Sequence, residues 1–475
     1  MQSLDNKNIA NANGDEIPLL PIVNLKNIHF ATGSALLYII VLGMVNSYSA
    51  PATVDMQLPG SRFRDITPDE ITWIASLPQV SGVVGNFLSG YVTHKLGRKA
   101  TLMFISTSYT SGWLAIAYAT SVPIIYLGRL ISGFSAGICA VAVPTYIVEI
   151  APTEIRGFLT SGFQVAFSVG VFLVIGLGAV LRWSWLAISG AVLTTSAVCL
   201  MVIMPESPAW LVQESRIGEA MKGIKFLKGK NSDLKKELQD ISDNQILSET
   251  DKFSFREFLN PTFYKPLGFA VLLMVFQQVS GVNIVLSYTV EVFGSIGSSV
   301  DPHIASAVVA AVQVGGTILS SFLMDKSGRK RLYITSATCM SVSYFVLGVY
   351  SYIVKHSEHP VNLHYYGWIP LVSLTVYTFA FSLGLGPIPF VMAPEMAPIR
   401  FRSMIVAIGS LMCSLSGFIV TKTFEDGRVL LGIYGLFWLY SGLCLLSALF
   451  GCFILPETKG LSFREIHRSF SVPED

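Results

Sequence analysis

The sequence predicts an all-α membrane protein with twelve spanning helices, on the basis of its composition, the length of its apolar blocks and an internal repeat. Of its 475 residues, 52% are hydrophobic and only 13% are charged, and the mean hydropathy is +0.58. Soluble domains carry about 25% charged residues, so this chain has too little polar surface for a soluble protein of its size. Its apolar residues fall in blocks of about 20 residues, which is the length that a helix needs to cross a bilayer.

Twelve such blocks follow one another along the chain. The expected spans are 30–50, 71–93, 100–119, 123–147, 157–180, 184–204, 266–292, 303–324, 331–353, 368–392, 403–422 and 430–455. Polar segments between and around them divide the chain into five parts. These are an N-terminal tail (1–29), a first six-helix half (30–204), a linker with amphipathic helices (205–265), a second six-helix half (266–455) and a C-terminal tail (456–475).

The distribution of charge predicts the orientation and excludes several kinds of partner. Lys and Arg are retained on the cytoplasmic side of a membrane, and most of the 32 fall in cytoplasmic segments if both termini lie in the cytoplasm. The net charge of +2 is too small to indicate a nucleic-acid partner. The six cysteines all fall within expected spans and show no CxxC spacing, so we expect neither a disulfide framework nor a bound metal.

Three short motifs at the cytoplasmic ends of spans occur twice, in the same order. The matched pairs are Gly97-Arg98-Lys99 with Gly328-Arg329-Lys330, Glu149 and Arg156 with Glu395 and Arg400, and Pro205-Glu206-Ser207 with Pro456-Glu457-Thr458. Such a repeat indicates that a unit of six helices was duplicated. Two parallel six-helix pseudo-repeats are the layout of the major facilitator superfamily, and the substrate site is then expected near the midplane, between the halves.

Further motifs resemble one family within that superfamily. They are Gly128-Arg129 in the fourth span, Pro144, Tyr146, Pro152 and Gly157 around the loop after it, Pro208 after the sixth span, Gln277-Gln278-Val279-Ser280-Gly281-Val282-Asn283 in the seventh and Gly386-Pro387-Ile388-Pro389 in the tenth. Over nearly the whole chain they resemble the sugar porters, which include the insect facilitative trehalose and hexose transporters and the facilitative glucose transporters. The resemblance implies that a small sugar is moved across the plasma membrane by alternating access.

The resemblance also implies which side chains bind the sugar. They are Gln164 in the fifth span, Gln277, Gln278 and Asn283 in the seventh, Gln313 in the eighth and Phe390 in the tenth. Carboxamides suit sugar hydroxyls because each presents both a donor and an acceptor, and polar residues within spans usually face the protein interior or a wet cavity. The alternative role is hydrogen bonding between helices, which contributes about 0.6 kcal/mol on average.

A second set of residues is implied to open and close the transporter. Tyr288 resembles the tyrosines that close over the sugar from outside, and Pro387 and Pro389 interrupt the tenth span as a gate or as a fixed kink. At the cytoplasmic end, the resemblance implies a latch between the halves in the outward-facing state. Its expected pairs are Glu149 with Arg400 and Glu395 with Arg156, assisted by Arg98, Asp325 and Arg329.

Several positions depart from the family pattern. They are His94 in place of an acid, Ala209 in place of an arginine, Phe390 in place of a tryptophan that packs on the sugar, Phe401 in place of a glycine, and Cys413-Ser414 in place of an Asn-Trp pair. The second half therefore offers fewer polar and aromatic contacts, and its smaller side chains leave room for a disaccharide. The identity of the sugar stays open between glucose, fructose and trehalose.

The first span indicates how transport is driven. Proton-coupled sugar porters carry an acid in the middle of this span, whereas here the nearest acid, Asp55, lies at or beyond its outer end. Because an intramembrane acid is the natural proton carrier, we expect facilitated diffusion by a monomer, with no cofactor and no enzymatic activity.

Arg129 lies deep in the fourth span, where it bonds backbone carbonyls or takes part in gating. The alternatives are a proton-coupled symporter, a sugar sensor of the same fold, and a porter of another solute.

Overall fold

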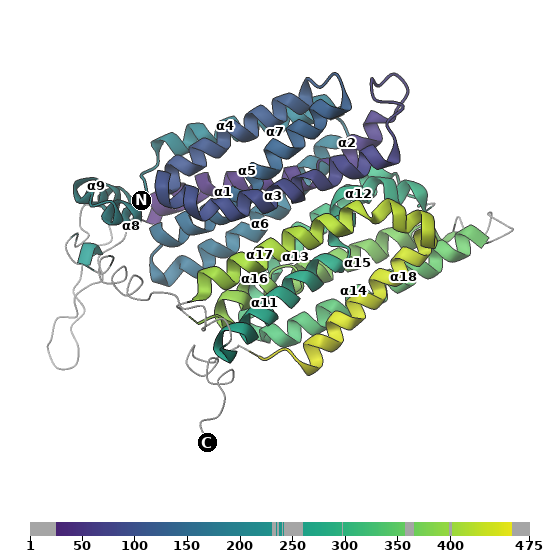
Figure 1. The fold of residues 1–475 in the computed structure, drawn as a ribbon. Coiled ribbons are helices and arrows are strands. Elements are labelled where there is room, and N and C mark those ends of the chain that lie inside the picture. Colours follow the sequence, from purple (N-terminus) through teal and green to yellow (C-terminus); the bar gives the residue numbers. More distant parts are fainter. Residues whose placement is uncertain are drawn as a thin grey trace, which may run out of the picture.

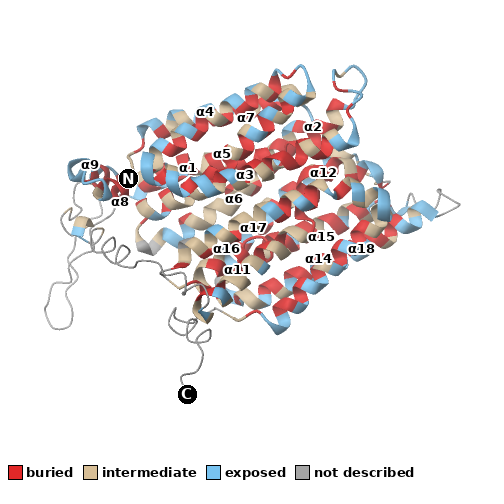
Figure 2. Ribbon diagram, in the orientation of Figure 1, coloured by how far each residue is buried: buried red, intermediate tan, exposed pale blue. Residues whose placement is uncertain are grey.

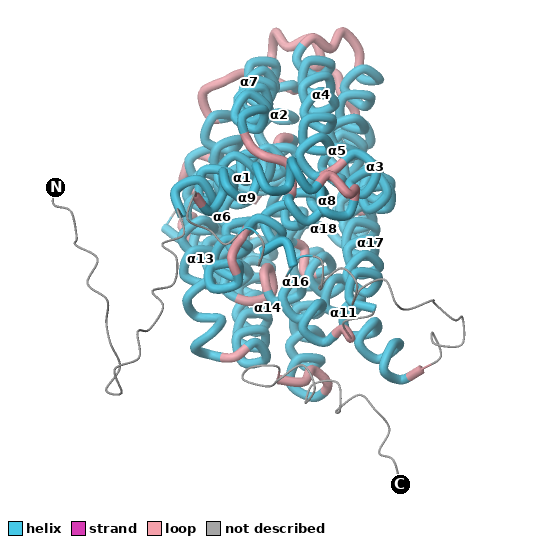
Figure 3. The backbone as a smooth tube through the Cα atoms, turned by 90° about the vertical axis from the view of Figure 1, so that its left-hand side faces the viewer, coloured by secondary structure: helices cyan, strands magenta, loops and turns pink. Residues whose placement is uncertain are grey.

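The computed structural model describes residues 25–229, 260–296, 298–356, 365–398 and 401–457, together with 234, 237–239 and 241 of the linker. In this part of the chain the regular structure is entirely helical. The helices form two bundles that lie side by side, one from each half of the sequence, and both views of the backbone show this division (Figures 1 and 3). The all-helical fold class is therefore confirmed.

The first bundle comprises seven helices. They are α1 (Leu25–Ser47), α2 (Ser49–Met56), α3 (Pro68–Leu96), α4 (Arg98–Ala117), α5 (Val122–Ile150), α6 (Thr153–Gly178) and α7 (Trp183–Ile203). The linker then forms α8 (Pro208–Gln213) and α9 (Ile217–Lys228), which pack on the end of the bundle where α1 begins. We call this the inner end and the opposite one the outer end.

The second bundle comprises eight helices. They are α11 (Pro261–Val279), α12 (Val282–Ser295), α13 (Pro302–Ser327), α14 (Arg329–His356), α15 (Ile369–Leu383), α16 (Ile388–Met396), α17 (Arg402–Lys422) and α18 (Phe424–Phe453). The two bundles meet where α3 packs on α17, α6 on α13, and α2 on α12. These three contacts bring spans from opposite ends of the sequence to one interface.

The helix boundaries follow from local chemistry that the two halves share. Gly97 (φ +91°) and Gly328 (φ +86°) end α3 and α13 in a conformation that favours glycine, so that α4 and α14 can start at once. At the outer end, Thr67 and Glu70 form a reciprocal capping box at the start of α3. Asp301 caps α13 in the second half by accepting from two backbone N–H groups.

Twelve spans account for these helices, with three corrections to the expected ranges. In the described residues, ten helices or helix pairs are long and apolar enough to cross a membrane. The other two spans are α3 and α4, of 29 and 20 residues, which contain more polar side chains. The first span ends at Ser47 and continues as α2, the seventh is divided into α11 and α12, and the tenth into α15 and α16.

The distribution of burial agrees with a membrane environment. Large apolar side chains cover the outside of the bundles, such as Phe87 (77% exposed), Val180 (86%) and Leu430 (82%). Buried residues gather inside each bundle and along the junction between them (Figure 2). An apolar exterior of this extent is stable in contact with lipid, and the polar interior described below is correspondingly shielded from it.

Candidate functional site

The seventh span is interrupted by a left-handed residue. Gly281 has φ +87°, so the helix stops at Val279 and restarts at Val282. The carbonyl groups freed at the break are taken up by two buried tyrosines: Tyr377 Oη donates to Ser280 O (3.1 Å) and Tyr344 Oη to Gly281 O (3.3 Å). The carbonyl groups at the break are therefore paired with side chains of neighbouring spans.

The tenth span is interrupted by two prolines. Pro387 and Pro389 lack the N–H groups that would reach Leu383 O and Leu385 O in a continuous helix. Side chains of neighbouring spans supply the missing donors. Ser320 Oγ donates to Leu383 O (2.9 Å), and Gln277 Nε2 donates to Leu385 O (3.3 Å) and Gly386 O (2.5 Å). The expected interruption of this span is thus present.

A chain of carboxamides runs through the break of the seventh span. Asn283 Nδ2 donates to Gln278 Oε1 (2.6 Å), and Gln278 Nε2 donates to Gln277 Oε1 (3.1 Å) and to Cys413 Sγ (2.8 Å). Gln277 and Asn283 are buried, with exposed fractions of 3% and 5%, and Gln278 is partly exposed. Three of the residues expected to bind sugar are therefore in contact with one another.

The first half contributes two carboxamides that the sequence analysis did not select. Gln79 of α3 donates through Nε2 to Asn46 Oδ1 of α1 (2.9 Å). A methyl group placed on Gly417 of α17 would lie 2.7 Å from Asn283 Nδ2, 3.3 Å from Gln278 Oε1 and 3.5 Å from Gln79 Oε1. Carboxamides of both halves thus converge on one bare stretch of α17. Gln164 was selected as a carboxamide inside an expected span, and Asn46 and Gln79 have the same property.

The remaining residues expected to bind sugar lie on the helices around this cluster. Gln164 is half-buried on α6 and Gln313 is buried on α13, the two helices that pack across the halves. Within the described part of the chain, neither carboxamide makes a hydrogen bond, so their donors and acceptors are available. Phe390 lies on α16 with 43% of its surface exposed. Within the described residues, none of these three side chains is hydrogen-bonded to the Gln277–Asn283 chain.

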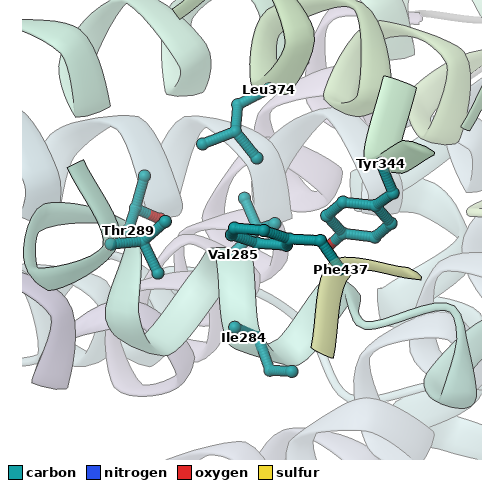
Figure 4. A pocket seen from close by; sticks show the side chains of 7 residues that line it. Ile284, Val285, Thr289, Tyr344, Leu374 and Phe437 are labelled. Atoms are coloured by element: carbon teal, nitrogen blue, oxygen red, sulfur yellow. The ribbon is translucent and has the colours of Figure 1, made fainter. Parts of the chain in front are cut away.

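Two hollows in the described structure lack the polar lining that a sugar requires. One lies behind α12 and measures about 10 Å³, which is room for about one water; Figure 4 shows its largely apolar lining of Ile284, Val285, Thr289, Tyr344, Leu374 and Phe437. The other, of about 450 Å³, lies among α3, α4 and α5 and is lined mainly by Val, Leu, Ile and Phe side chains. The carboxamide cluster, in contrast, offers both donors and acceptors to a sugar.

At the outer end, α12 packs on α17 and α18 within the second half, and Lys422 reaches the first half. Tyr288 is 1% exposed, stacks on Phe424 with ring centroids 4.6 Å apart and donates to Thr421 O (3.3 Å). The buried position of Tyr288 is compatible with the expected lid. Lys422 connects the halves: its ammonium group pairs with Asp69, donates to Thr72 Oγ1 (2.9 Å) and lies 4.6 Å from the centre of the Trp73 ring.

At the inner end, the repeated motifs meet within each half. In the first half, Arg98 pairs with Glu149 (2.8 Å), and Glu206 Oε1 accepts from the backbone N–H groups of Arg98 and Lys99 (2.9 Å each). In the second half, Arg329 pairs with Glu395 (3.3 Å) and its backbone N–H donates to Glu457 Oε1 (3.0 Å). The duplicated sequence motifs therefore encode one duplicated cluster, which joins the starts of α4 and α14 to the ends of α7 and α18.

The expected latch between the halves is not formed where both of its partners are described. Arg156 is exposed and donates to Ala151 O of its own half (3.4 Å), while Glu395 is held by Arg329. Glu149 is likewise held by Arg98, and it accepts from Ser207 Oγ as well. Arg400 and the side chain of Asp325 lie outside the described residues. The assisting arginines thus hold both acids within their own halves in this structure.

Two departures from the family pattern acquire contacts of their own. His94 faces the linker helix α8, since its carbonyl accepts from Trp210 Nε1 (2.7 Å) and its ring Nε2 lies 3.1 Å from Gln213 Nε2. Phe401 packs edge-to-face on Phe263, with ring centroids 5.0 Å apart. The histidine ring adds a contact with Gln213 to the backbone bond that any residue at position 94 could accept, and Phe401 adds an aromatic contact at the base of α17.

Arg129 is completely buried and bonds the backbone of two neighbouring spans. Its Nε donates to Ile74 O (2.9 Å) and its Nη1 to Val45 O (2.8 Å). Ile74 O lacks its helical partner because residue 78 is proline, so the arginine supplies a missing donor. The expected bonding to carbonyls is confirmed. No acid occurs in α1, and Val45 is the residue of α1 that Arg129 contacts by hydrogen bonding.

Two bundles of six spans, with a neutral carboxamide cluster where they meet, define a polytopic membrane transporter of the major facilitator type. Comparison with known proteins agrees. The family profile described as "Sugar (and other) transporter" matches residues 26–470. The facilitated trehalose transporter Tret1 of Apis mellifera ligustica is 34% identical over 436 residues, which is 91% of this chain and 86% of that protein. Tret1 of Bombyx mori is 34% identical over 90% of this chain and 83% of its own. The chain therefore belongs to the sugar transporter family.

Solved structures support the fold independently. The inward-open conformation of the xylose transporter XylE from E. coli superposes with a TM-score of 0.76 at 23% identity, covering 93% of this chain and 99% of that one. The proton:xylose symporter XylE bound to 6-bromo-6-deoxy-D-glucose gives a TM-score of 0.74 at 24% identity, covering 94% and 100%. At this level of identity the likeness shows the fold alone, and the role of the protein as a transporter rests on the family match and the Tret1 relatives.

Proposed function

We propose that this protein is a facilitative sugar uniporter, which moves a hexose such as glucose or the disaccharide trehalose across the plasma membrane by alternating access. It works as a monomer, with both termini and the 205–265 linker in the cytoplasm. The observation that carries the proposal is the neutral carboxamide cluster at the junction of the halves. Gln278 and Asn283 at the broken seventh span lie within reach of Gln79 from the first half.

The chemistry of this cluster favours a neutral polyol over an ion. Its polar groups are carboxamides and hydroxyls, which offer donors and acceptors without net charge. Gln164, Gln313 and Phe390 lie on the surrounding spans and would complete the contacts with the sugar. A sugar porter needs only weak binding, because a Kd of about 1 mM corresponds to about −4.1 kcal/mol. A few hydrogen bonds of ordinary strength are enough for that.

The absence of a buried acid near the cluster supports uniport. Within the described residues, α1 contains no Asp or Glu, and Arg129 is bonded to carbonyl oxygens rather than to a carboxylate. The best-placed carboxylate near the outer end of α12, Glu291, is paired with Arg428 (2.9 Å). A proton carrier at mid-depth is thus missing from this part of the chain. The Tret1 relatives are facilitated transporters of trehalose by name, which points the same way.

The contacts at the two ends of the molecule suggest how it alternates between its inward-facing and outward-facing states. At the outer end, Lys422 joins the halves and α2 packs on α12, while Glu149 and Glu395 at the inner end are each paired within their own half. This combination suits an inward-facing or occluded state. In the outward-facing state we expect the acids to exchange partners across the halves, Glu149 with Arg400 and Glu395 with Arg156. The two arrangements must differ by only a few kcal/mol if both are to be populated.

Reconstituted uptake tests this proposal. The purified protein in liposomes should equilibrate labelled glucose or trehalose at a rate that an inward proton gradient does not change. Gln278→Ala should slow uptake, whereas Gln57→Ala, an exposed glutamine of the outer loop, should not. Accumulation above equilibrium that a protonophore abolishes would instead identify a proton-coupled symporter. Absence of uptake by folded protein would leave a sensor or a porter of another solute.

A further inference from the structure

A chain of side-chain amides in the first half has its direction set by a backbone carbonyl. Asn46 of α1 donates through Nδ2 to Leu42 O (2.9 Å), and Gln79 of α3 donates through Nε2 to Asn46 Oδ1 (2.9 Å). A carbonyl oxygen only accepts hydrogen bonds, so Asn46 must turn its NH2 group to Leu42 and its oxygen to Gln79. Gln79 must then turn its own NH2 group to Asn46. The free end of the chain is Gln79 Oε1, which accepts no hydrogen bond within the described residues.

A buried arginine holds the two helices that carry this chain. Arg129 is completely buried and donates to Val45 O, directly before Asn46 in α1. It also donates to Ile74 O, in the segment of α3 that precedes Gln79. Asn46 and Gln79 themselves are partly exposed. The position of the Gln79 oxygen is therefore fixed by the first half, and its direction follows from the amide chain.

The oxygen of Gln79 meets the carboxamides of the second half beside α17. A methyl group on Gly417 would lie 3.5 Å from Gln79 Oε1 and 3.3 Å from Gln278 Oε1. The two oxygens are therefore no farther apart than the sum of these distances, which one sugar ring can bridge. Gln278 Oε1 accepts one hydrogen bond, from Asn283 Nδ2, and a carboxamide oxygen can accept two. Each half thus offers an acceptor oxygen toward the same point.

The amides of the second half are oriented by the same rule. Asn283 donates to Gln278, and Gln278 donates to Gln277. Gln277 in turn donates to the backbone carbonyls of Leu385 and Gly386. This chain also starts at carbonyl groups that only accept, so each amide turns its oxygen toward the next one. A group that binds between Gln278 Oε1 and the oxygen of the first half must therefore be able to donate.

We infer that Gln79 binds the sugar from the first half by accepting a hydrogen bond from one of its hydroxyl groups, and that Asn46 is the positioning residue that orients Gln79. Two neighbouring hydroxyls can donate one hydrogen bond to Gln79 Oε1 and one to Gln278 Oε1, so a single sugar is held by both halves. A sugar phosphate or a sugar acid would place an anionic group, which cannot donate, against these oxygens and is rejected. This inference rests on the proposed sugar transport.

Sugar analogues test the direction of this hydrogen bond in the unmodified protein. The monodeoxy and monofluoro derivatives of glucose and of trehalose compete with the labelled parent sugar for uptake into liposomes, and the inhibition constants are compared. At the hydroxyl that Gln79 binds, the deoxy derivative should bind about twofold to tenfold more weakly than the parent sugar, as the loss of one hydrogen bond implies. The fluoro derivative should lose as much, because fluorine cannot donate.

Matched variants show which residue accepts from that hydroxyl. Gln79→Leu should weaken binding of the parent sugar by the same factor, whereas Gln57→Leu, at an exposed glutamine of the outer loop, should not. For the derivative that lacks the bonded hydroxyl, Gln79→Leu should cause no further loss, because no hydrogen bond is left to remove. Asn46→Leu should weaken binding about twofold, since the Gln79 amide can then take either orientation. It should have no effect when combined with Gln79→Leu.

An equal loss for the parent sugar and every deoxy derivative in Gln79→Leu would overturn the inference while leaving sugar transport intact, because Gln79 would then act without touching the sugar. Full tolerance of the fluoro derivative at the position that depends on Gln79 would also overturn it, by showing that the residue donates. If Gln79→Leu does not fold, Gln79→Met, which keeps the length of the side chain, takes its place. Failure of the folded wild-type protein to take up either sugar would overturn the proposed function itself.

Discussion

The two halves use one device to satisfy a carbonyl group that proline leaves without a donor, but they use it in different settings. In the first half, Pro78 frees Ile74 O, and the fully buried Arg129 bonds it. In the second half, Leu385 O is bonded by Gln277. In both halves the donor comes from a neighbouring span, because an unsatisfied carbonyl group at membrane depth is strongly disfavoured.

The settings differ in rigidity. Arg129 stands on α5, an uninterrupted helix of 29 residues, and it bonds α3, which continues through its proline. Gln277 stands beside a glycine break and bonds a second break, and it is hydrogen-bonded to the carboxamides of the site. We call the first half the rigid half, because the two helices that Arg129 joins run uninterrupted through the contact. We call the second half the jointed half, because the two spans that Gln277 joins are both divided at the site.

The largest effect should come from removing the rigid donor. Arg129→Met leaves Ile74 O and Val45 O without their side-chain donors, and each unsatisfied carbonyl costs about 1–3 kcal/mol. The substitution also removes the cost of burying the charge of the arginine, which offsets part of this loss. We therefore expect the free energy of unfolding to fall by about 2–4 kcal/mol. Thermal unfolding of the detergent-purified protein measures this. The exposed Arg182→Met is the control, and an unchanged melting temperature for Arg129→Met would contradict the comparison.

An intermediate effect is expected where both halves meet, at Gly417. Its missing side chain lets Asn283 lie against α17, because a methyl group there would stand 2.7 Å from Asn283 Nδ2. Gly417→Ala should displace that amide and cost about one hydrogen bond, 0.5–1.5 kcal/mol, which raises the KM for sugar by roughly twofold to tenfold. Gly409→Ala on the same helix is the matched control, since the nearest atom there is at 3.6 Å. Equal KM values for the two variants would remove Gly417 from the site.

The sequence predicted the fold because span length and charge asymmetry are properties of single segments. The number and order of spans followed from apolar block length, and the duplicated motifs predicted a duplicated unit, although the expected pairs lay across the halves and the observed ones lie within each half. The break at Pro387 and Pro389 was also readable, because proline acts locally. The break at Gly281 was not separated from the seventh span, since a single glycine within an apolar block is compatible with a continuous helix.

The site was only partly predictable, for reasons of tertiary contact. Gln278 and Asn283 were selected from their motif, whereas Asn46 and Gln79 were missed because nothing in the sequence shows which face of a span meets the other half. The side chain of Gln277 donates its hydrogen bonds to carbonyl groups of residues more than a hundred positions away in the sequence. Hydrogen-bonding capacity is used up by such distant partners, so a motif alone does not tell which of its members stays free.

The smallest effect is expected at the outer end, where Lys422 of the jointed half contacts residues of the rigid half. Lys422 pairs with Asp69, donates to Thr72 and lies over the Trp73 ring. Because the Asp69 side chain is 72% exposed, we discount the ion pair to about 0.5–1 kcal/mol.

If the outer end must open for sugar to enter from outside, Lys422→Met weakens the closed state and raises the fraction of outward-facing carriers. The KM measured from the outside should then fall about twofold to fivefold relative to that measured from the inside, as this energy implies. Lys355→Met is the matched control, because Lys355 also lies over an aromatic ring, that of Tyr434, but within one half. If both variants shift the ratio of the two KM values equally, the effect comes from surface charge. A shift confined to Lys422→Met means that the rigid half restrains the jointed half through this contact.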